Sequence, residues 1–361
     1  MSSKNYLNYH VIISHSPSCL NRDDMNMQKS AVFGGARRVR ISSQSLKRAM
    51  RKSGYYEQEL GSPSDRTIHL GMLKNKYVDL LSDRFPEDLV TRTLGLIAGK
   101  DATADDAKAD AVAPWSITEV ERLCKIVRAA DEKSLDPKKL EKLVSDESVS
   151  LRASAAKAVD IALSGRMATS GLMTKIDGAM AVAHSITTHA VDADIDWFTA
   201  VDDLVEEEGE VGAGHLNTQE FSSGVFYRYA SLNIGQLMTN MGADRKAALD
   251  VAAHMAWLMA TVVPDAKRNS FGQDNPADFL LASFSDMPLS FANAFEKPIQ
   301  SLNGSGFLTP SLRALEDYME RVHKGYGIDE RHKVFSLSET AIAPRAKSFA
   351  ELMDWIRGNG E

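Results

Sequence analysis

A long helical segment interrupts a chain whose two ends contain strand patterns. From about Gly61 to Met180 the sequence is rich in Ala, Leu, Lys and Glu. Its apolar periodicity predicts helices near 66–82, 87–98, 115–130, 137–144 and 148–163. The strand patterns on either side lack the regular alternation with helices that a parallel sheet requires. The sequence therefore predicts an α+β fold with one inserted helical lobe.

Three segments outside the lobe have the composition of buried strands. Residues 6–14 are rich in β-branched side chains, and residues 279–285 (FLLASFS) are almost entirely apolar. Residues 224–234 (GVFYRYASLNI) are apolar on both faces, which is typical of a central strand. Further helices are predicted at 244–263 and 309–324. The two ends of the chain are therefore expected to contain strands and helices in mixed order.

An acidic segment follows the helical lobe. Residues 189–222 hold ten Asp and Glu and no Lys or Arg. Apolar and acidic residues alternate within 191–201, as in a strand with one apolar and one acidic face. A glycine-rich stretch precedes a return strand, so a long β-hairpin is predicted. Phe198 falls on the acidic face, where it is either turned into the core by a twist or exposed as a wedge between stacked bases.

Positive charge is concentrated near the N-terminus. The net charge of −7 argues against phosphate binding, which depends on Lys and Arg. Residues 1–70 nevertheless hold 11 Lys and Arg against 5 Asp and Glu, a net of +6 that leaves −13 for the rest. Charges act over a Debye length of about 8–10 Å, so a local excess outweighs the total. A polyanion is expected to bind at this end.

A predicted strand and helix at 36–54 carry most of this positive charge. Ser42 or Ser43 is expected to cap the helix, and Gly54 to end it in a left-handed conformation. On a helical wheel one face holds the cations Lys47, Arg48, Arg51 and Lys52, and the opposite arc holds Leu46, Ala49, Met50 and Ser53. Three more cations, Arg37, Arg38 and Arg40, precede the helix.

The basic helix has two interpretations. It is either a solvated surface or a binding site for a polyanion. The pattern alone does not distinguish RNA from DNA or from a phosphorylated small molecule as that polyanion. No acid falls between Met25 and Tyr56 to neutralise the cations. Amides and serine hydroxyls at a helix N-terminus also attract phosphate. These two features favour the polyanion site.

Catalytic motifs are absent from the sequence. It contains no H-E-x-x-H, paired C-x-x-C, Walker loop or nucleophile elbow. His15 with Asp23 and Asp24 is a trio suited in principle to metal or acid–base chemistry. The two acids are better explained as turn caps or as partners of Arg22 or Arg37. Cys19 and Cys124 are too few for a disulfide framework. With no secretory signal and no apolar run near 20 residues, we expect a cytoplasmic protein without membrane contact, metal or cofactor.

Five segments resemble one known family. They are 14–56, which contains the basic helix, 161–171 (IALSGRMATSG), 191–204 (VDADIDWFTAVDDL), 215–230 (HLNTQEFSSGVFYRYA) and 284–297 (FSDMPLSFANAFEK). They are similar to the backbone subunit of the type I-E CRISPR complex Cascade, a member of the Cas-seven family. The resemblance covers nearly the whole chain and is weakest in the helical lobe.

The resemblance implies a hand-shaped molecule. A ferredoxin-like (RRM-like) palm would comprise 1–59, 181–189 and 224–361, with helical fingers at 60–180 and a β-hairpin thumb at 190–223. Members of the family assemble in several copies, about six, along one guide RNA (crRNA), together with other Cascade subunits. The thumb kinks the RNA at regular intervals, and the bases between the kinks pair with target DNA in an R-loop.

The resemblance also assigns residues to these roles. Contacts with the RNA backbone fall on Arg22, Lys29, Ser42, Gln44, Ser45, Lys47, Arg48 and Arg51. Contacts that form the kink fall on Met167, Phe198, Thr199 and Leu216. The expected protein binds RNA and is not an enzyme. The alternative is a metal-dependent ribonuclease that uses Asp23 or Asp24, because related type III subunits cleave RNA with an Asp in the corresponding loop.

Overall fold

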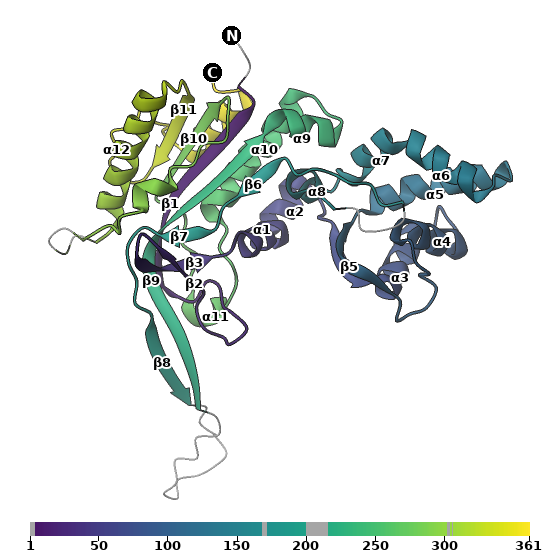
Figure 1. Cartoon of the computed structure of the whole chain (residues 1–361), viewed down its shortest axis with the longest axis horizontal. Coiled ribbons are helices and arrows are strands. Elements are labelled where there is room, and N and C mark those ends of the chain that lie inside the picture. Colours follow the sequence, from purple (N-terminus) through teal and green to yellow (C-terminus); the bar gives the residue numbers. More distant parts are fainter. Residues whose placement is uncertain (1–3, 168–171, 200–215, 302–303, 305) are drawn as a thin grey trace, which may run out of the picture. The chain divides into compact units, whose positions relative to one another are not determined.

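The chain folds into two compact units (Figure 1). The computed structural model describes residues 4–167, 172–199, 216–301, 304 and 306–361, except for the side chains of 197–199 and 216–217. The first unit comprises Met1–Ser53, Val182–Ser231 and Met255–Glu361, and the second comprises Gly54–Ala181 and Leu232–His254. Residues 232–254 thus belong to the second unit, although the sequence placed them with the palm.

An antiparallel sheet forms the centre of the first unit. Its strands run in the order β11 (Arg331–Ser336), β10 (Phe279–Ser285), β1 (Tyr6–Ser18), β9 (Leu216–Asn233), β7 (Ser185–Thr187), β3 (Ala36–Ile41) and β2 (Ser30–Phe33). Tyr6 lies opposite Ser285 and Ile12 opposite Phe279 in the antiparallel pair of β1 and β10. The predicted combination of α and β elements is confirmed, and the sheet is antiparallel. Strand β9 is interior, as its two apolar faces indicated.

Helices pack on both faces of β10, because successive strand residues point to opposite sides. Phe279 and Leu281 share a core with η1 (Ala292–Phe295) and α12 (Leu308–Tyr326). Phe284 points the other way and contacts Trp355 of α13 (Phe349–Arg357), with ring centroids 5.5 Å apart and the rings tilted by 58°. The remaining helices of this unit are α1 (Ser43–Lys52) and α11 (Arg268–Phe271), and α10 (Arg245–Thr261) continues into it from the second unit.

The second unit is mostly helical and has its own core. Its helices are α2 (Gly54–Leu60), α3 (Leu70–Leu81), α4 (Glu87–Ala98), α5 (Ile117–Glu132), α6 (Pro137–Asp146), α7 (Ser148–Ala155), α8 (Val159–Ser164) and α9 (Ile234–Met241). Tyr77 and Trp115 are buried in this core, and the Tyr77 hydroxyl donates to the Trp115 carbonyl at 3.1 Å. The strand β6 (Met180–Val182) lies where the chain leaves this unit.

Three local predictions for this region are wrong. The helix predicted at 66–82 begins as a strand, β4 (Asp65–His69), which pairs with the unpredicted β5 (Lys108–Trp115). Pairing with a distant strand has overridden local helix propensity there. The helix predicted at 148–163 is two helices, and the buried Asp160 in the second one accepts hydrogen bonds from the amide and hydroxyl of Ser64.

The basic helix ends at an extended Ser53, and Gly54 starts α2 instead of forming a left-handed cap.

The predicted hairpin is present in the paired strands β8 (Asp194–Thr199) and β9. Thr199 lies opposite Leu216 and Asp194 opposite Phe221. Its apolar face is less buried than the alternation suggested, because the Ile195 side chain is 56% exposed. Among the described helices, none is long and apolar enough to cross a membrane.

Candidate nucleic-acid interface

The N-terminus of α1 is held by three side chains. Ser42 is the N-cap, as predicted, and its hydroxyl accepts the Ser45 amide at 3.2 Å. The Ser42 amide donates to Asn21 Oδ1 at 2.8 Å, and the Ser43 amide donates to His184 Nδ1 at 2.9 Å. A cap of this kind contributes about 1 kcal/mol to helix stability. In this first turn, the Gln44 amide has no partner among the described residues and is the backbone donor left for an anion.

Asn21 and His184 support the N-terminus of α1, and the sequence analysis did not include either of them in the site. Because His184 Nδ1 accepts the Ser43 amide, its neutral ring carries the proton on Nε2. Partial burial lowers the pKa of His184, and the positive charges of Arg40 and Lys29 lower it further. Both cations therefore act at the N-terminal end of α1.

The two faces of α1 differ as the helical wheel predicted. Leu46 and Met50 are buried, and they anchor the helix to the first unit. Gln44, Arg48 and Lys52 are exposed, while Lys47 and Arg51 are half-buried. The helix has no acidic residue in its first turn, and Arg51 and Lys52 lie in its last turn. The exposed face can therefore offer several cations to a phosphate chain.

The loop before β2 brings a further cation to this surface. The Lys29 amide donates to the Asn21 carbonyl at 2.8 Å, and the Arg40 amide donates to the Lys29 carbonyl at 2.9 Å. Arg22 forms a backbone bridge with Gln28, and its guanidinium donates to Asn26. The predicted contacts Arg22 and Lys29 are thus held in the same loop by backbone hydrogen bonds.

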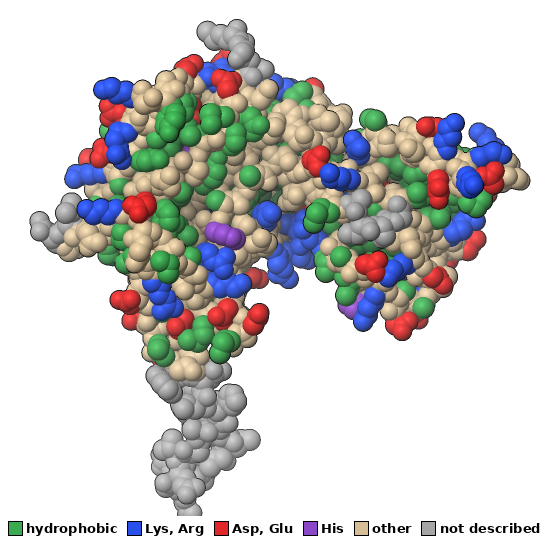
Figure 2. Space-filling view, viewed as in Figure 1, with side chains coloured by type: hydrophobic (Ala, Val, Ile, Leu, Met, Phe, Trp, Pro, Cys, Tyr) green, Lys and Arg blue, Asp and Glu red, His purple; other side chains and the backbone are tan. Residues whose placement is uncertain are grey.

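The arginines of β3 do not all belong to this surface. Arg38 is fully buried, and its guanidinium donates to the carbonyls of Thr187 at 2.9 Å, Phe295 at 2.9 Å and Glu296 at 3.2 Å. Burial lowers its pKa. Arg38 therefore adds no charge to the surface around α1, because its guanidinium is bonded to carbonyls inside the unit. Figure 2 shows Lys and Arg gathered where Figure 1 places α1, β2 and β3.

One acidic residue of the hairpin, Glu220, has partners within the same unit. Glu220 on β9 is 7% exposed and accepts the Gln28 amide at 3.0 Å. Arg37 Nη2 lies 3.7 Å from its other carboxylate oxygen. Glu220 therefore ties the base of the hairpin to the loop that carries Arg22 and Lys29.

The four predicted kink-forming residues divide between the units. Met167 belongs to the second unit and is 81% exposed. Phe198, Thr199 and Leu216 belong to the first unit, where Phe198 lies opposite Asn217 in the backbone register of the hairpin. The side chains of Phe198, Thr199 and Leu216 lie outside the described part of the structure.

Two of the residues considered for catalysis, His15 and Asp23, have structural partners. Asp23 Oδ1 accepts the amides of Met25 and Met27, both at 2.9 Å, as expected of a turn cap. His15 is 3% exposed and contacts Arg228, and burial lowers its pKa to about 3. Burial also raises the pKa of the Cys19 thiol. Within the described ranges, no group of three or more His, Cys, Asp or Glu side chains could hold a metal ion.

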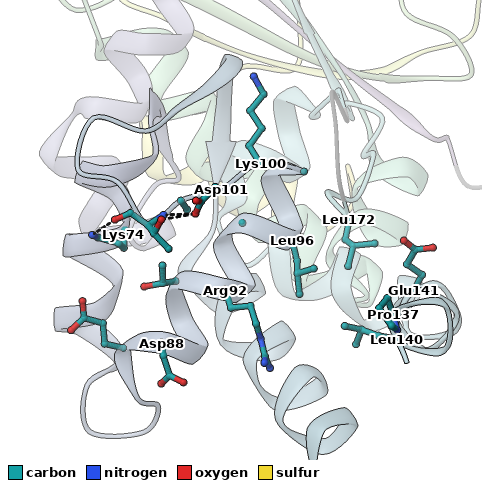
Figure 3. Close-up of a pocket in the computed structure, with 16 residues that line it drawn as sticks. Lys74, Asp88, Arg92, Leu96, Lys100, Asp101, Pro137, Leu140, Glu141 and Leu172 are labelled. Atoms are coloured by element: carbon teal, nitrogen blue, oxygen red, sulfur yellow. Dashed lines mark hydrogen bonds between the residues drawn. The ribbon is translucent and has the colours of Figure 1, made fainter. Parts of the chain in front are cut away.

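The second unit contains an open cavity of about 1340 Å³ (Figure 3). Leu96, Leu140 and Leu172 give it an apolar side, and Lys74, Arg92 and Lys100 also line it. Each of these three cations forms an ion pair with an aspartate of the same unit, namely Asp105, Asp131 and Asp110. The cavity is therefore poorly suited to a polyanion, and the basic surface around α1 remains the candidate interface.

These features combine an antiparallel sheet with a helix, α1, that has one cationic face suited to a polyanion. The chain belongs to the CT1975-like protein family, whose model matches residues 7–355. A comparison with curated proteins gave no match.

Two solved structures have similar folds over almost the full chain. One, described as a CRISPR RNA-guided surveillance complex, pre-nicking, is 27% identical, with a TM-score of 0.81 and coverage of 99% of this chain and 100% of that one. The other, described as a CRISPR RNA-guided surveillance complex, is 23% identical, with a TM-score of 0.60 and coverage of 98% of both chains. The second supports the fold alone.

Proposed function

We propose that this chain is a guide-RNA-binding backbone subunit of a CRISPR surveillance complex of the type I-E Cascade kind. The observation that carries the proposal is the cationic face of α1, whose N-terminus lies within the field of Lys29 and Arg40. The family and the similarity to a subunit of an RNA-guided complex support the choice of RNA over other polyanions. Such a subunit binds and positions RNA and does no chemistry itself.

In this proposal two groups of residues contact different parts of the RNA. Arg22, Lys29, Ser42, Gln44, Ser45, Lys47, Arg48 and Arg51 hold the phosphate backbone. Met167 from the fingers and Phe198, Thr199 and Leu216 from the thumb interrupt the base stack. Several copies bind side by side on one guide RNA, contact the other subunits of the complex, and leave the bases between kinks free to pair with target DNA. For the ribonuclease alternative, Asp23 Oδ1 caps its own turn, so that alternative would depend mainly on Asp24.

The dependence of binding on RNA length tests this proposal. We expect the affinity and the number of bound copies to rise stepwise as single-stranded RNA is lengthened, since each added copy contributes its own phosphate contacts. Native mass spectrometry would count the copies, and fluorescence anisotropy would measure the affinity. Binding that is weak, independent of RNA length and competed by inorganic phosphate would contradict it and indicate a small-molecule phosphate site.

A further inference from the structure

A desolvated ion pair lies at the base of the loop that carries Met167. Arg166 and Glu119 form two parallel hydrogen bonds of 2.6 Å, and their side chains are 0% and 1% exposed. The Thr174 hydroxyl donates to Glu119 Oε1 at 2.7 Å, and Arg166 Nε donates to the Thr174 carbonyl at 3.0 Å. The three side chains form one closed network that joins both ends of the loop to the first turn of α5.

The backbone of this loop is fixed at the same place. The amides and carbonyls of Arg166 and Ile176 bond to each other at 2.7 and 3.0 Å. Gly165 has a φ of +75°, which favours glycine. A Cβ at this position would lie 2.7 Å from the Ile176 carbonyl oxygen, so the two chain segments approach too closely for a side chain. Further along, the Leu172 amide donates to the Leu96 carbonyl of α4 at 2.9 Å. The backbone next to Met167 is therefore fixed by these hydrogen bonds.

Stability alone does not explain this arrangement. Removing two charges from water is costly, and an apolar pair of similar volume is often as stable. What the ion pair adds is geometry, because the Arg fork and the carboxylate bind in one plane and one orientation. The residue next to this fixed point is Met167, an apolar side chain that is 81% exposed. A rigid support next to an exposed apolar side chain indicates that this side chain contacts a partner in one fixed orientation.

We propose that the Glu119–Arg166–Thr174 network positions Met167 against the bases of the guide RNA. Glu119, Arg166 and Thr174 are positioning residues, because they are held within the second unit and act on RNA through the loop. This inference rests on the proposed function, and it predicts that the network controls the regularity of the RNA kinks with little effect on RNA affinity.

The test is chemical probing of the guide RNA in the assembled complex, with 2′-hydroxyl acylation read at every nucleotide. The main variant is the double replacement Glu119→Leu with Arg166→Met, which removes the charges together and keeps the volume. Thr174→Val provides a milder second variant that removes only the hydroxyl. Met167→Ala is the reference for loss of the contact. Lys74→Met is the matched control, because it removes a largely buried cation of the same unit that pairs with Asp105.

We expect periodic reactivity in the wild type and in Lys74→Met, and a blurred pattern in Met167→Ala, the double variant and Thr174→Val. RNA affinity should stay within about twofold, since the phosphate contacts are unchanged. A periodic pattern in a folded double variant or in Thr174→Val, with Met167→Ala blurred, would overturn the inference and leave the proposed function intact. Uniform reactivity in the wild type would overturn both the kinking role and this inference.

Discussion

Replacing Lys47, Arg48 and Arg51 together with glutamine is expected to lower the slope of log affinity for RNA against log salt by about 2. Each phosphate contact with a single strand contributes about 0.7 to that slope, because it releases a condensed counterion. The three side chains lie on the face of α1 opposite Leu46 and Met50, so their loss should leave the helix packed. Binding would be measured by anisotropy over a range of salt concentrations.

A triple variant on α12 is the matched control for this measurement. Arg313, Arg321 and Lys324 are exposed, and replacing them with glutamine removes the same charge from the same unit. We expect the slope of this control to stay near that of the wild type. Equal slopes for the two triple variants would contradict the assignment of the RNA backbone to α1.

Arg38→Met is expected to lower the free energy of unfolding by about 3 kcal/mol or more. It leaves two buried carbonyls and one partly buried carbonyl without their donor, and each unsatisfied buried group costs about 1–3 kcal/mol. Arg37→Met should cost less than about 1 kcal/mol, because Arg37 is exposed and its contact with Glu220 is long, at 3.7 Å. Urea unfolding of both variants would measure the difference. Similar losses for these neighbouring arginines would show that Arg38 is not a structural residue.

The parts of the fold with strong local periodicity were predictable. The bounds expected for α4 and β10, 87–98 and 279–285, match those in the structure, because apolar spacing alone specifies them. The strands β4 and β5 were not predictable in the same way. They stabilise each other across about 50 residues, from Asp65 to Trp115, and neither has a strong strand pattern of its own.

In the candidate site, too, features set by neighbouring residues were predictable, and features set by residues distant in the sequence were not. The cap at Ser42 and the two faces of α1 follow from spacing within a dozen residues. The burial of Arg38 depends on carbonyls at Thr187 and Phe295, and the support of Ser43 comes from His184. Such partners are brought together only by the sheet, so a local pattern of charges could not separate Arg38 from Arg37. The kink-forming roles of Phe198, Thr199 and Leu216 stay predictions.

Co-purification with RNA tests the central claim most directly. The full chain would be expressed with the other subunits of its complex and a CRISPR array, and the bound RNA would be sequenced, sized and compared with the amount of protein. We expect one discrete guide RNA flanked by repeat sequence and bound by several copies of this chain. Absence of RNA, or heterogeneous RNA at one copy per molecule, would contradict the proposal that this protein is the backbone of an RNA-guided complex.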